Sequence, residues 1–246
     1  MSKRLYPLVP SHSDFKTVIS LTVHKSISRN MGLWLEIDFR PVYWEGYYET
    51  GIGGKKVSNF GEDYKKAYEE VLDELGRTLS SVDPASLEKL CDEIFKADQV
   101  FFVGVGRVLL ALQCVCKRLA HLGIRTHYVG EITEPAITKK DLLIVGSGSG
   151  MSLFPLGIAK KAHTIGAKIV HIGSNPNSEM KDLCEFMVRI PVRTKFYLED
   201  EIDSCQPMTS LFEQSVLLLG DVLAKMIIER RQLDMKGLWQ YHANLE

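Results

Sequence analysis

The sequence has almost no net charge, no long apolar run and no signal peptide. Its 30 lysines and arginines are balanced by 31 aspartates and glutamates over 246 residues. Without a positive excess the chain lacks the field that attracts nucleic acids or anionic membranes, so we expect neither as a partner. No run of about 18 apolar residues marks a membrane span. The N-terminal stretch MSKRLYPLVPSHSDF lacks the order of a secretory signal, and we therefore expect a cytoplasmic protein.

Cysteine is scarce, and its spacing does not suit a disulfide or a metal site. The five cysteines, at positions 91, 114, 116, 184 and 205, include no C-x-x-C pair. Zinc sites and disulfide frameworks need closely spaced, paired ligands. Cys114 and Cys116 are two residues apart on an expected helix, where they point in different directions. We therefore predict free thiols and no bound metal.

The first 60 residues differ from the rest, and their sequence indicates no function. They hold nine of the 22 aromatic residues without a sustained helical period, although 16–23 and 33–43 are compatible with short extended stretches. A DNA-binding regulator would carry a helical domain here. Eight basic residues against five acidic ones do not support that assignment. Two explanations stay open: a genuine N-terminal extension, or upstream sequence translated from a misplaced start.

From residue 61 to residue 246 the pattern predicts an α/β domain. Apolar residues at spacings of three and four indicate a helix from Glu62, and Asp83 followed by Pro84 indicates the start of a second helix. A strongly apolar helix is expected over 209–230, and we expect it to lie in a subunit interface. Alternation of short apolar runs with helical stretches indicates a five-stranded parallel sheet sandwiched between helices. The apolar runs lie at 99–104, 126–130, 141–150, 168–174 and 186–191.

Small polar loops follow three of these strands and indicate a phosphate site. In parallel sheets, ligands bind beyond the carboxyl ends of the strands. Glycines let backbone N–H groups approach an anion, and each loop leads into the positive end of a helix. Recurring serines add hydroxyl donors, which favours phosphate binding over simple tight turns. The residues that we assign to this site are Gly104, Gly106, Arg107, Ser147, Gly148, Ser149, Ser152 and Ser174.

The phosphate could belong to a nucleotide or to a sugar. No G-K-[ST] follows a glycine loop, which excludes a Walker-type site, and GVGRVL lacks the third glycine of the dinucleotide fingerprint. Glu131, 27 residues after Gly104, lies near the position expected for a ribose-binding acid. An NAD-binding oxidoreductase is therefore a weaker alternative.

Partly buried carboxylates and histidines are the candidates for acid–base chemistry. Glu213, in QPMTSLFEQ, lies beside an apolar run, where burial makes a carboxylate a better general base. His121, in RLAHLG, ends an expected helix, whose dipole favours a protonated ring. The full set of candidates is His121, His127, Glu131, Glu134, His171, Glu213 and His242.

Five motifs, in order along the chain, resemble the 6-phospho-3-hexuloisomerase branch of the sugar isomerase (SIS) domain family. They are KRLAHLG, YVGEITEPAITKKDLLIVGSGSG, AKKAHTIGAK, QPMTSLFEQ and the terminal YHANLE. The resemblance runs from about residue 62 to residue 246. It implies an SIS domain over 61–246, preceded by an N-terminal segment over 1–60 of unknown structure.

The resemblance implies an enzyme that interconverts D-arabino-hex-3-ulose 6-phosphate and D-fructose 6-phosphate without a metal or organic cofactor, in the ribulose monophosphate pathway. It also implies a homodimer or homotetramer whose active sites are shared between subunits. Glu213 would be the base, and His121 its partner in ring opening or proton transfer. The serine loop would bind the phosphate. We also assign Glu131, Gln206 and His242 to the substrate site, and for His242 two roles stay open: reaching the site of a neighbouring subunit, or closing an interface.

Two positions depart from the family pattern and suggest a second hypothesis. The chain reads GVGRVL where the family usually has G-x-G-R-S-G, and SGSGMS where it has S-G-S-G-E-T. Ser152 can replace the threonine hydroxyl. Val108 cannot donate a hydrogen bond, and Met151 cannot replace a carboxylate. The alternative to an isomerase is therefore a phosphosugar-binding module without catalysis, since SIS domains also serve in regulators.

Overall fold

The computed structural model describes residues 59–245 and the backbone of two strands, 17–27 and 33–43. The chain divides into two units, Met1–Asn59 and Phe60–Glu246. In the first unit, β1 (Thr17–Ile27) and β2 (Leu33–Tyr43) form an antiparallel pair in which Thr17 lies opposite Tyr43. These strands contain most of the two stretches that the sequence marked as extended. The second unit carries all of the predicted site residues.

The second unit is built on a five-stranded parallel sheet with the order β4-β3-β5-β6-β7. This confirms the predicted fold class. β3 is flanked by β4 on one side and by β5 on the other, so the chain reverses its direction of progress across the sheet at β3. The strands are β3 (Val100–Val103), β4 (Thr126–Tyr128), β5 (Leu142–Gly146), β6 (Lys168–Gly173) and β7 (Phe186–Arg189).

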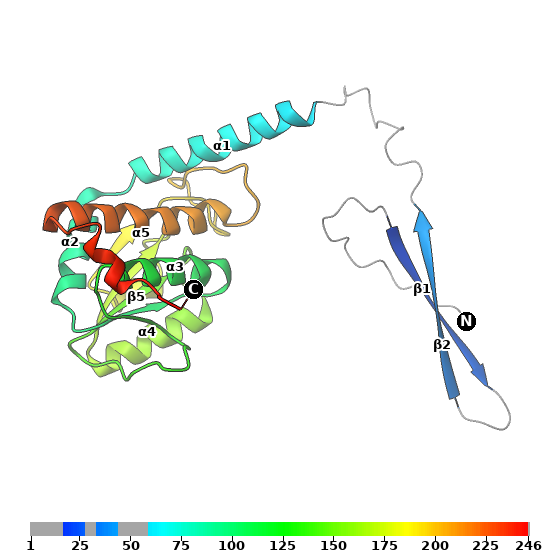
Figure 1. Ribbon diagram of the computed structural model, residues 1–246, viewed down its shortest axis with the longest axis horizontal. Coiled ribbons are helices and arrows are strands. Elements are labelled where there is room, and N and C mark those ends of the chain that lie inside the picture. The colour runs from blue at the N-terminus through cyan, green and yellow to red at the C-terminus, as the bar shows by residue number, and fades with distance from the viewer. Residues whose placement is uncertain (1–16, 28–32, 44–58, 246) are drawn as a thin grey trace. The chain divides into compact units, whose positions relative to one another are not determined.

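Helices cover both faces of the sheet (Figure 1). One face packs against helices α2, α3 and α5, and the other packs against α4. The α-helices are α1 (Phe60–Ser80), α2 (Pro84–Lys96), α3 (Gly106–Ala120), α4 (Leu153–Ile165) and α5 (Ser210–Arg231), and two 3₁₀ helices are η1 (Glu179–Asp182) and η2 (Gly237–Tyr241). In the part described by the structure, no helix is long and apolar enough to cross a membrane.

Local sequence explains where several helices begin and end. The Asp83 carboxylate accepts hydrogen bonds from the Ala85 and Ser86 N–H groups, both at 3.1 Å, and Pro84 occupies the first helical position. Helix α4 ends at Ile165, and its C-cap residue Gly166 has a φ of 87°, the left-handed conformation that favours glycine. The start of α2 matches the prediction made from Asp83 and Pro84.

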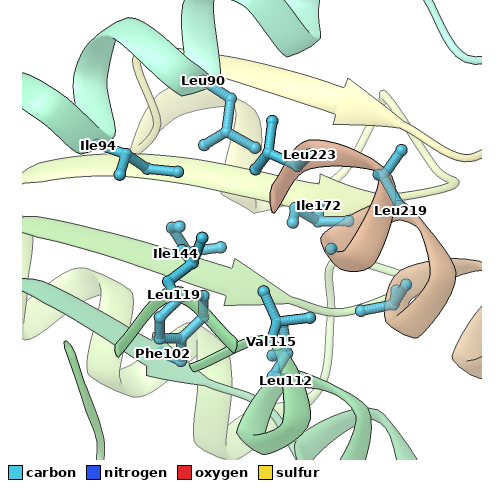
Figure 2. A pocket seen from close by; sticks show the side chains of 12 residues that line it. Leu90, Ile94, Phe102, Leu112, Val115, Leu119, Ile144, Ile172, Leu219 and Leu223 are labelled. Carbon is cyan, nitrogen blue, oxygen red and sulfur yellow. The ribbon is translucent and has the colours of Figure 1, made fainter. Parts of the chain in front are cut away.

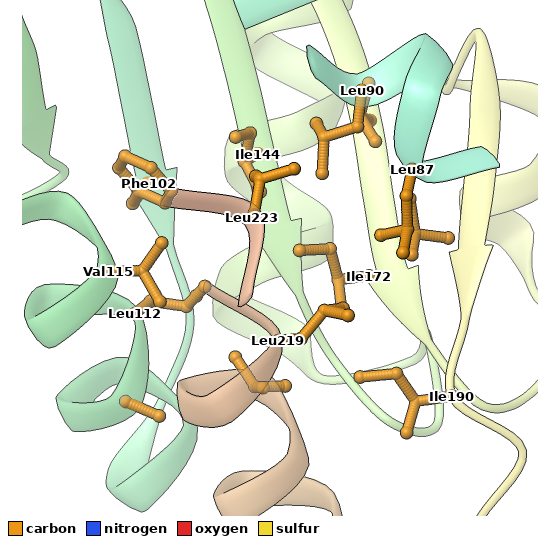
Figure 3. Packing of buried hydrophobic residues seen from close by; sticks show 14 of the residues in the cluster. Leu87, Leu90, Phe102, Leu112, Val115, Ile144, Ile172, Ile190, Leu219 and Leu223 are labelled. Atoms are coloured by element: carbon orange, nitrogen blue, oxygen red, sulfur yellow. The ribbon is translucent and has the colours of Figure 1, made fainter. Parts of the chain in front are cut away.

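The core has one layer on each side of the sheet, because residues of the strands alternate between the two faces. Phe102 and Val100 contribute to the cluster with α2, α3 and α5, whereas Phe101 and Val103 contribute to the cluster with α4. All four side chains are fully buried. Strands that are apolar on both faces are typical of parallel sheets. Figure 3 shows the first cluster, where strand residues meet side chains of the covering helices.

A small pocket lies inside this first cluster (Figure 2). It has no polar side chain, so it belongs to the core and offers nothing to hold a sugar phosphate. Its lining residues are Leu90, Ile94, Phe102, Leu112, Val115, Leu119, Ile144, Ile172, Val216, Leu219, Gly220 and Leu223.

Helices α5 and α1 differ from the sequence expectation in what covers them. Most apolar residues of α5 pack into the core of their own chain, so its apolar character does not require a subunit interface. On α1 the expected apolar face is divided. Val71, Leu75 and Leu79 contact the core. The aromatic and leucine side chains nearer the start of α1 are exposed, because this half of the helix extends past the core: Phe60, Tyr64, Tyr68 and Leu72.

Glu74 ties α1 to the segment that precedes α5. Its carboxylate is almost fully buried and accepts hydrogen bonds from the Cys205 N–H at 2.6 Å, the Ser204 hydroxyl at 2.7 Å and the Gln206 side-chain amide at 2.9 Å. Burial by itself would raise the pKa of Glu74, but these hydrogen bonds outweigh it and lower the pKa from 4.5 to about 2. The carboxylate therefore stabilises the fold as an anion.

We expect Glu74→Gln to lower the free energy of unfolding at neutral pH by about 2 kcal/mol, because charged hydrogen bonds to three donors are weakened. Because the folded-state pKa is lowered, the stabilisation is complete above pH 4.5 and is lost as the pH falls toward about 2. The difference between wild type and variant should therefore shrink over that range. Urea unfolding measures the free energy of unfolding of both proteins at each pH.

Glu69→Gln, at an exposed ion pair with Lys65, is the control and should have little effect on stability. A Glu74→Gln protein as stable as wild type would show that the Glu74 carboxylate does not stabilise the fold.

Candidate active site

The predicted phosphate loops meet at the carboxyl edge of the sheet. β3 and β5 are neighbours and run parallel, with Val103 opposite Val145. The loop after β3, which contains Gly104 and Gly106, therefore lies beside the serine loop, residues 147–152. In open α/β sheets this is the edge where ligands bind, at the point where the strand order reverses. The structure confirms that the two loops lie at the same edge.

The serine loop is a tight turn that leads into α4. The Ser147 hydroxyl lies 3.4 Å from the Ser152 hydroxyl, and the Ser149 hydroxyl accepts a hydrogen bond from the Met151 N–H at 3.3 Å. Ser152 is the N-cap residue of α4, yet its side chain does not cap the helix. The first N–H groups of α4 and the hydroxyls of this loop can therefore donate to a phosphate.

Gly150 is required by the shape of this loop. Its φ is +66°, and a Cβ at this position would collide with the Ser178 side chain. Backbone groups of the loop also form hydrogen bonds. The Gly148 carbonyl accepts from the Ser174 N–H at 2.9 Å, and the Ser147 N–H donates to the Ile172 carbonyl. Backbone contacts of this kind hold the loop close to β6.

His171 supports the loop from within the core. It is 1% exposed, and its Nε2–H donates to the Ser147 carbonyl at 2.8 Å. Burial lowers the pKa of His171 below its ordinary value of 6.5, which keeps the ring neutral. The sequence placed His171 among acid–base candidates. The structure instead gives it a contact that fixes the loop.

Glu213 and Arg107 form the charged part of the site. The Arg107 guanidinium donates to Glu213 Oε2, and the Thr209 hydroxyl donates to Oε1 at 2.9 Å. Glu213 is in the first turn of α5 and its side chain is 10% exposed, whereas that of Arg107 is 63% exposed. The structure thus joins a predicted base to a predicted phosphate-site residue 106 positions away.

Thr209 was not found by sequence reasoning. Its position four residues before Glu213 was an available signal, because side chains at that spacing meet on one face of a helix.

Three other predicted residues are engaged elsewhere. The Ser174 hydroxyl lies 2.8 Å from the Val192 carbonyl and 2.9 Å from Glu201, both acceptors. Gln206 donates to Glu74. Glu131 lies 2.6 Å from Nδ1 of His127, just beyond β4. For each of these residues, a contact with substrate stays a prediction.

His121 and His242 lie together but away from Glu213. Their rings are stacked with centroids 5.0 Å apart, and the Trp239 ring is 5.1 Å from that of His242. His121 is the C-cap of α3, as predicted, whereas Arg107 is in the first turn of the same helix. The 15 residues of α3 span about 22 Å. One chain therefore does not bring His121 to Glu213.

The two departures from the family pattern have different surroundings. Val108 packs against the core and lies over Gly146, where a side chain would meet both Val108 and Leu112. Met151 is 46% exposed at the serine loop. Val108 therefore serves packing, whereas Met151 leaves an apolar surface beside the candidate phosphate site.

The described residues contain no cluster of three or more His, Cys, Asp or Glu that could hold a metal ion. Their five cysteines are free thiols, as predicted, and two of them are buried.

Comparison with known proteins assigns the chain to a family. The 3-hexulose-6-phosphate isomerase of Bacillus subtilis is 33% identical, over 72% of this chain and 96% of its own length. That of Mycobacterium gastri is 34% identical, over 77% of this chain and 95% of its own length. The chain belongs to the 3-hexulose-6-phosphate isomerase family. The predicted resemblance is thereby confirmed, although no family model matches the chain.

A solved structure agrees with this family assignment. A crystal structure of a Methanococcus jannaschii protein, from which a molecular function of 3-hexulose-6-phosphate isomerase was inferred, is 31% identical. It covers 74% of this chain and 99% of its own chain, with a TM-score of 0.63.

The contact between His171 and Ser147 leads to a pH-dependent prediction. The lowered pKa means that the unfolded chain takes up a proton more readily, so His171 makes the fold less stable as the pH falls below about 6.5. His171→Gln keeps an N–H donor but does not titrate there. Its free energy of unfolding should fall less than that of wild type between about pH 7 and about pH 5.

Urea unfolding at the two pH values measures this difference. His163→Gln, at an exposed position on α4, is the control for the loss of an imidazole. Equal pH dependence in wild type and His171→Gln would show that His171 is not the group responsible.

Proposed function

We propose that this protein interconverts D-arabino-hex-3-ulose 6-phosphate and D-fructose 6-phosphate. The observation that carries the proposal is a nearly buried carboxylate, Glu213, held at the same sheet edge as a serine loop in a chain of the 3-hexulose-6-phosphate isomerase family. We assign the reaction domain to residues 61–246 and leave residues 1–60 without a function. This division is supported by relatives that match 72% and 77% of the chain but almost their full length.

The reaction moves a carbonyl group between C3 and C2 of the sugar. A base removes the proton from C2, which gives an enediolate across C2 and C3, and the proton returns to C3 while the oxygen proton passes from O2 to O3. One carboxylate can serve both carbon transfers. Glu213 is assigned this role, and we assign to the Arg107 guanidinium the stabilisation of the negative oxygen of the enediolate.

The phosphate is assigned to the serine loop and the start of α4. Ser147, Ser149 and Ser152 provide hydroxyls, and Gly148 and Gly150 keep the backbone accessible. Because these groups hold the phosphate in both ground and transition state, they should act mainly on KM.

His121 is assigned to the site of a second copy of the chain. It lies at the end of α3 opposite to the end that carries Arg107, so a site that uses both His121 and Glu213 needs two subunits. We therefore propose a homodimer or homotetramer with shared sites. His242, stacked on His121, would enter the same site. The cytoplasmic location stays a prediction.

A phosphosugar-binding module without turnover is the second candidate. It is favoured by Met151, which places an exposed thioether where the family pattern has a carboxylate. An assay of fructose 6-phosphate formation tests both candidates.

We expect Glu213→Gln to lower kcat by about 10²- to 10⁴-fold, because the amide cannot accept the carbon-bound proton. The assay couples ribulose 5-phosphate, formaldehyde and a hexulose-phosphate synthase to the detection of fructose 6-phosphate. Glu229→Gln, at an exposed ion pair further along α5, should retain wild-type activity. No turnover by wild type, together with thermal stabilisation by fructose 6-phosphate, would favour the binding module.

Co-expression of two inactive variants tests the shared site. Glu213→Gln and His121→Ala chains, each with a different tag, should form mixed dimers in which one of two sites has both residues intact. Half of the activity of wild-type dimers is expected in purified mixed dimers. Mixed dimers without activity would show that the two residues do not meet across subunits.

A further inference from the structure

Thr209 contacts Glu213 through both its backbone and its side chain. The Glu213 N–H donates to the Thr209 carbonyl at 3.1 Å, and the Thr209 hydroxyl donates to Glu213 Oε1 at 2.9 Å. Thr209 immediately precedes α5, and Glu213 lies about one turn into it. The two contacts together hold the backbone of Glu213 and the carboxylate at the end of its side chain.

The Thr209 hydroxyl does not serve the role that its position would normally give it. Threonine at the N-cap usually accepts a hydrogen bond from a backbone N–H of the first turn. Asp83 does this for α2, but no such side-chain bond is made by Thr209. The hydroxyl donates its hydrogen bond to the Glu213 carboxylate instead. This contact therefore orients Glu213 and does not cap the helix.

The backbone before Thr209 is strained. Met208 has a φ of +56°, which is unfavourable for a residue other than glycine. Its side chain is 96% exposed, so packing of the methionine does not explain the conformation. Strain of this kind persists where the surrounding structure requires it, and it concentrates at functional sites. The strained residue immediately precedes Thr209, the N-cap of α5.

The two carboxylate oxygens have different partners. Oε1 is bound by a neutral hydroxyl on the same turn, and Oε2 is bound by Arg107, a long side chain that is largely exposed. The contact with Thr209 joins residues four apart at the start of α5. The exposed Arg107 side chain, by contrast, can leave Oε2 for another partner. We propose that Thr209 is a positioning residue that holds Oε1 and so directs Oε2, the oxygen that carries the proton between C2 and C3. This inference rests on the proposed function.

Removal of the hydroxyl should lower the rate of the chemical step without loss of substrate binding. Thr209→Val keeps the shape of the side chain, and we expect kcat to fall about 10- to 100-fold because small displacements of a catalytic group are costly. KM should stay within about twofold. Thr209→Ser restores the hydroxyl and should recover most of the wild-type kcat. If Thr209→Val does not fold, Thr209→Ala makes the same comparison.

Thr138→Val is the matched control. The Thr138 hydroxyl also donates to a buried carboxylate, Asp141 Oδ2, at 2.8 Å, but before the amino end of β5. This variant loses the same kind of hydrogen bond away from the site and should keep the wild-type kcat.

The outcomes separate this inference from the proposed function. If wild type turns over and Glu213→Gln does not, while Thr209→Val keeps the wild-type kcat, the positioning role is wrong and the isomerase is supported. A reduced kcat in Thr209→Val that serine does not restore also overturns the positioning role. If wild type does not turn over the hexulose phosphate, the proposed function fails, and this inference fails with it.

Discussion

The parallel sheet buries both of its faces, and this burial fixes where the helices and the polar loops can lie. Phe101 and Phe102 are neighbours on β3, and each is fully buried, one against α4 and the other against α3 and α5. Such a sheet cannot expose either face to water, so helices must cover both. The polar chemistry is then left to the loops at the carboxyl edge, where the chain passes from each strand to the next helix.

The carboxyl edge keeps its shape through contacts that do not themselves involve the substrate. Neutral His171 holds the serine loop by the Ser147 carbonyl, and Glu201 accepts hydrogen bonds from the Thr194 and Leu198 N–H groups. These contacts are buried or half-buried, where a missing partner is costly. The Ser152 side chain does not cap α4, so it does not occupy the first N–H groups of that helix. Donors that are held in place in advance cost less to order when an anion binds.

The candidate acid–base groups lie near the two opposite ends of α3. The carboxyl edge has Glu213 paired with Arg107, whereas the far end of α3 has His121 stacked on His242. Under the proposed function, a site that uses both Glu213 and His121 needs two copies of the chain. Helix α5, by contrast, is part of the core of its own chain.

Much of the fold could be predicted from the sequence, because hydrophobic period and glycine position report on the backbone locally. The five strands, the Asp83 cap and the serine loop are of this kind, and Glu213 was found because an acidic residue beside an apolar run is unusual. The burial of α1 was predicted less well. Its period is correct, but Tyr64 and Tyr68 are exposed, since period shows which residues share a face and not where the core ends.

Local patterns in the sequence identify the elements, the parallel direction of the five strands and the residue types available at the carboxyl edge. Which of those residues meet depends on how the elements pack in three dimensions. Packing joined Arg107 to Glu213 and Gln206 to Glu74. The physical reason is that a hydrogen bond acts over about 3 Å. The spacing that brings two distant residues this close depends on strand order and helix packing, which local patterns do not encode.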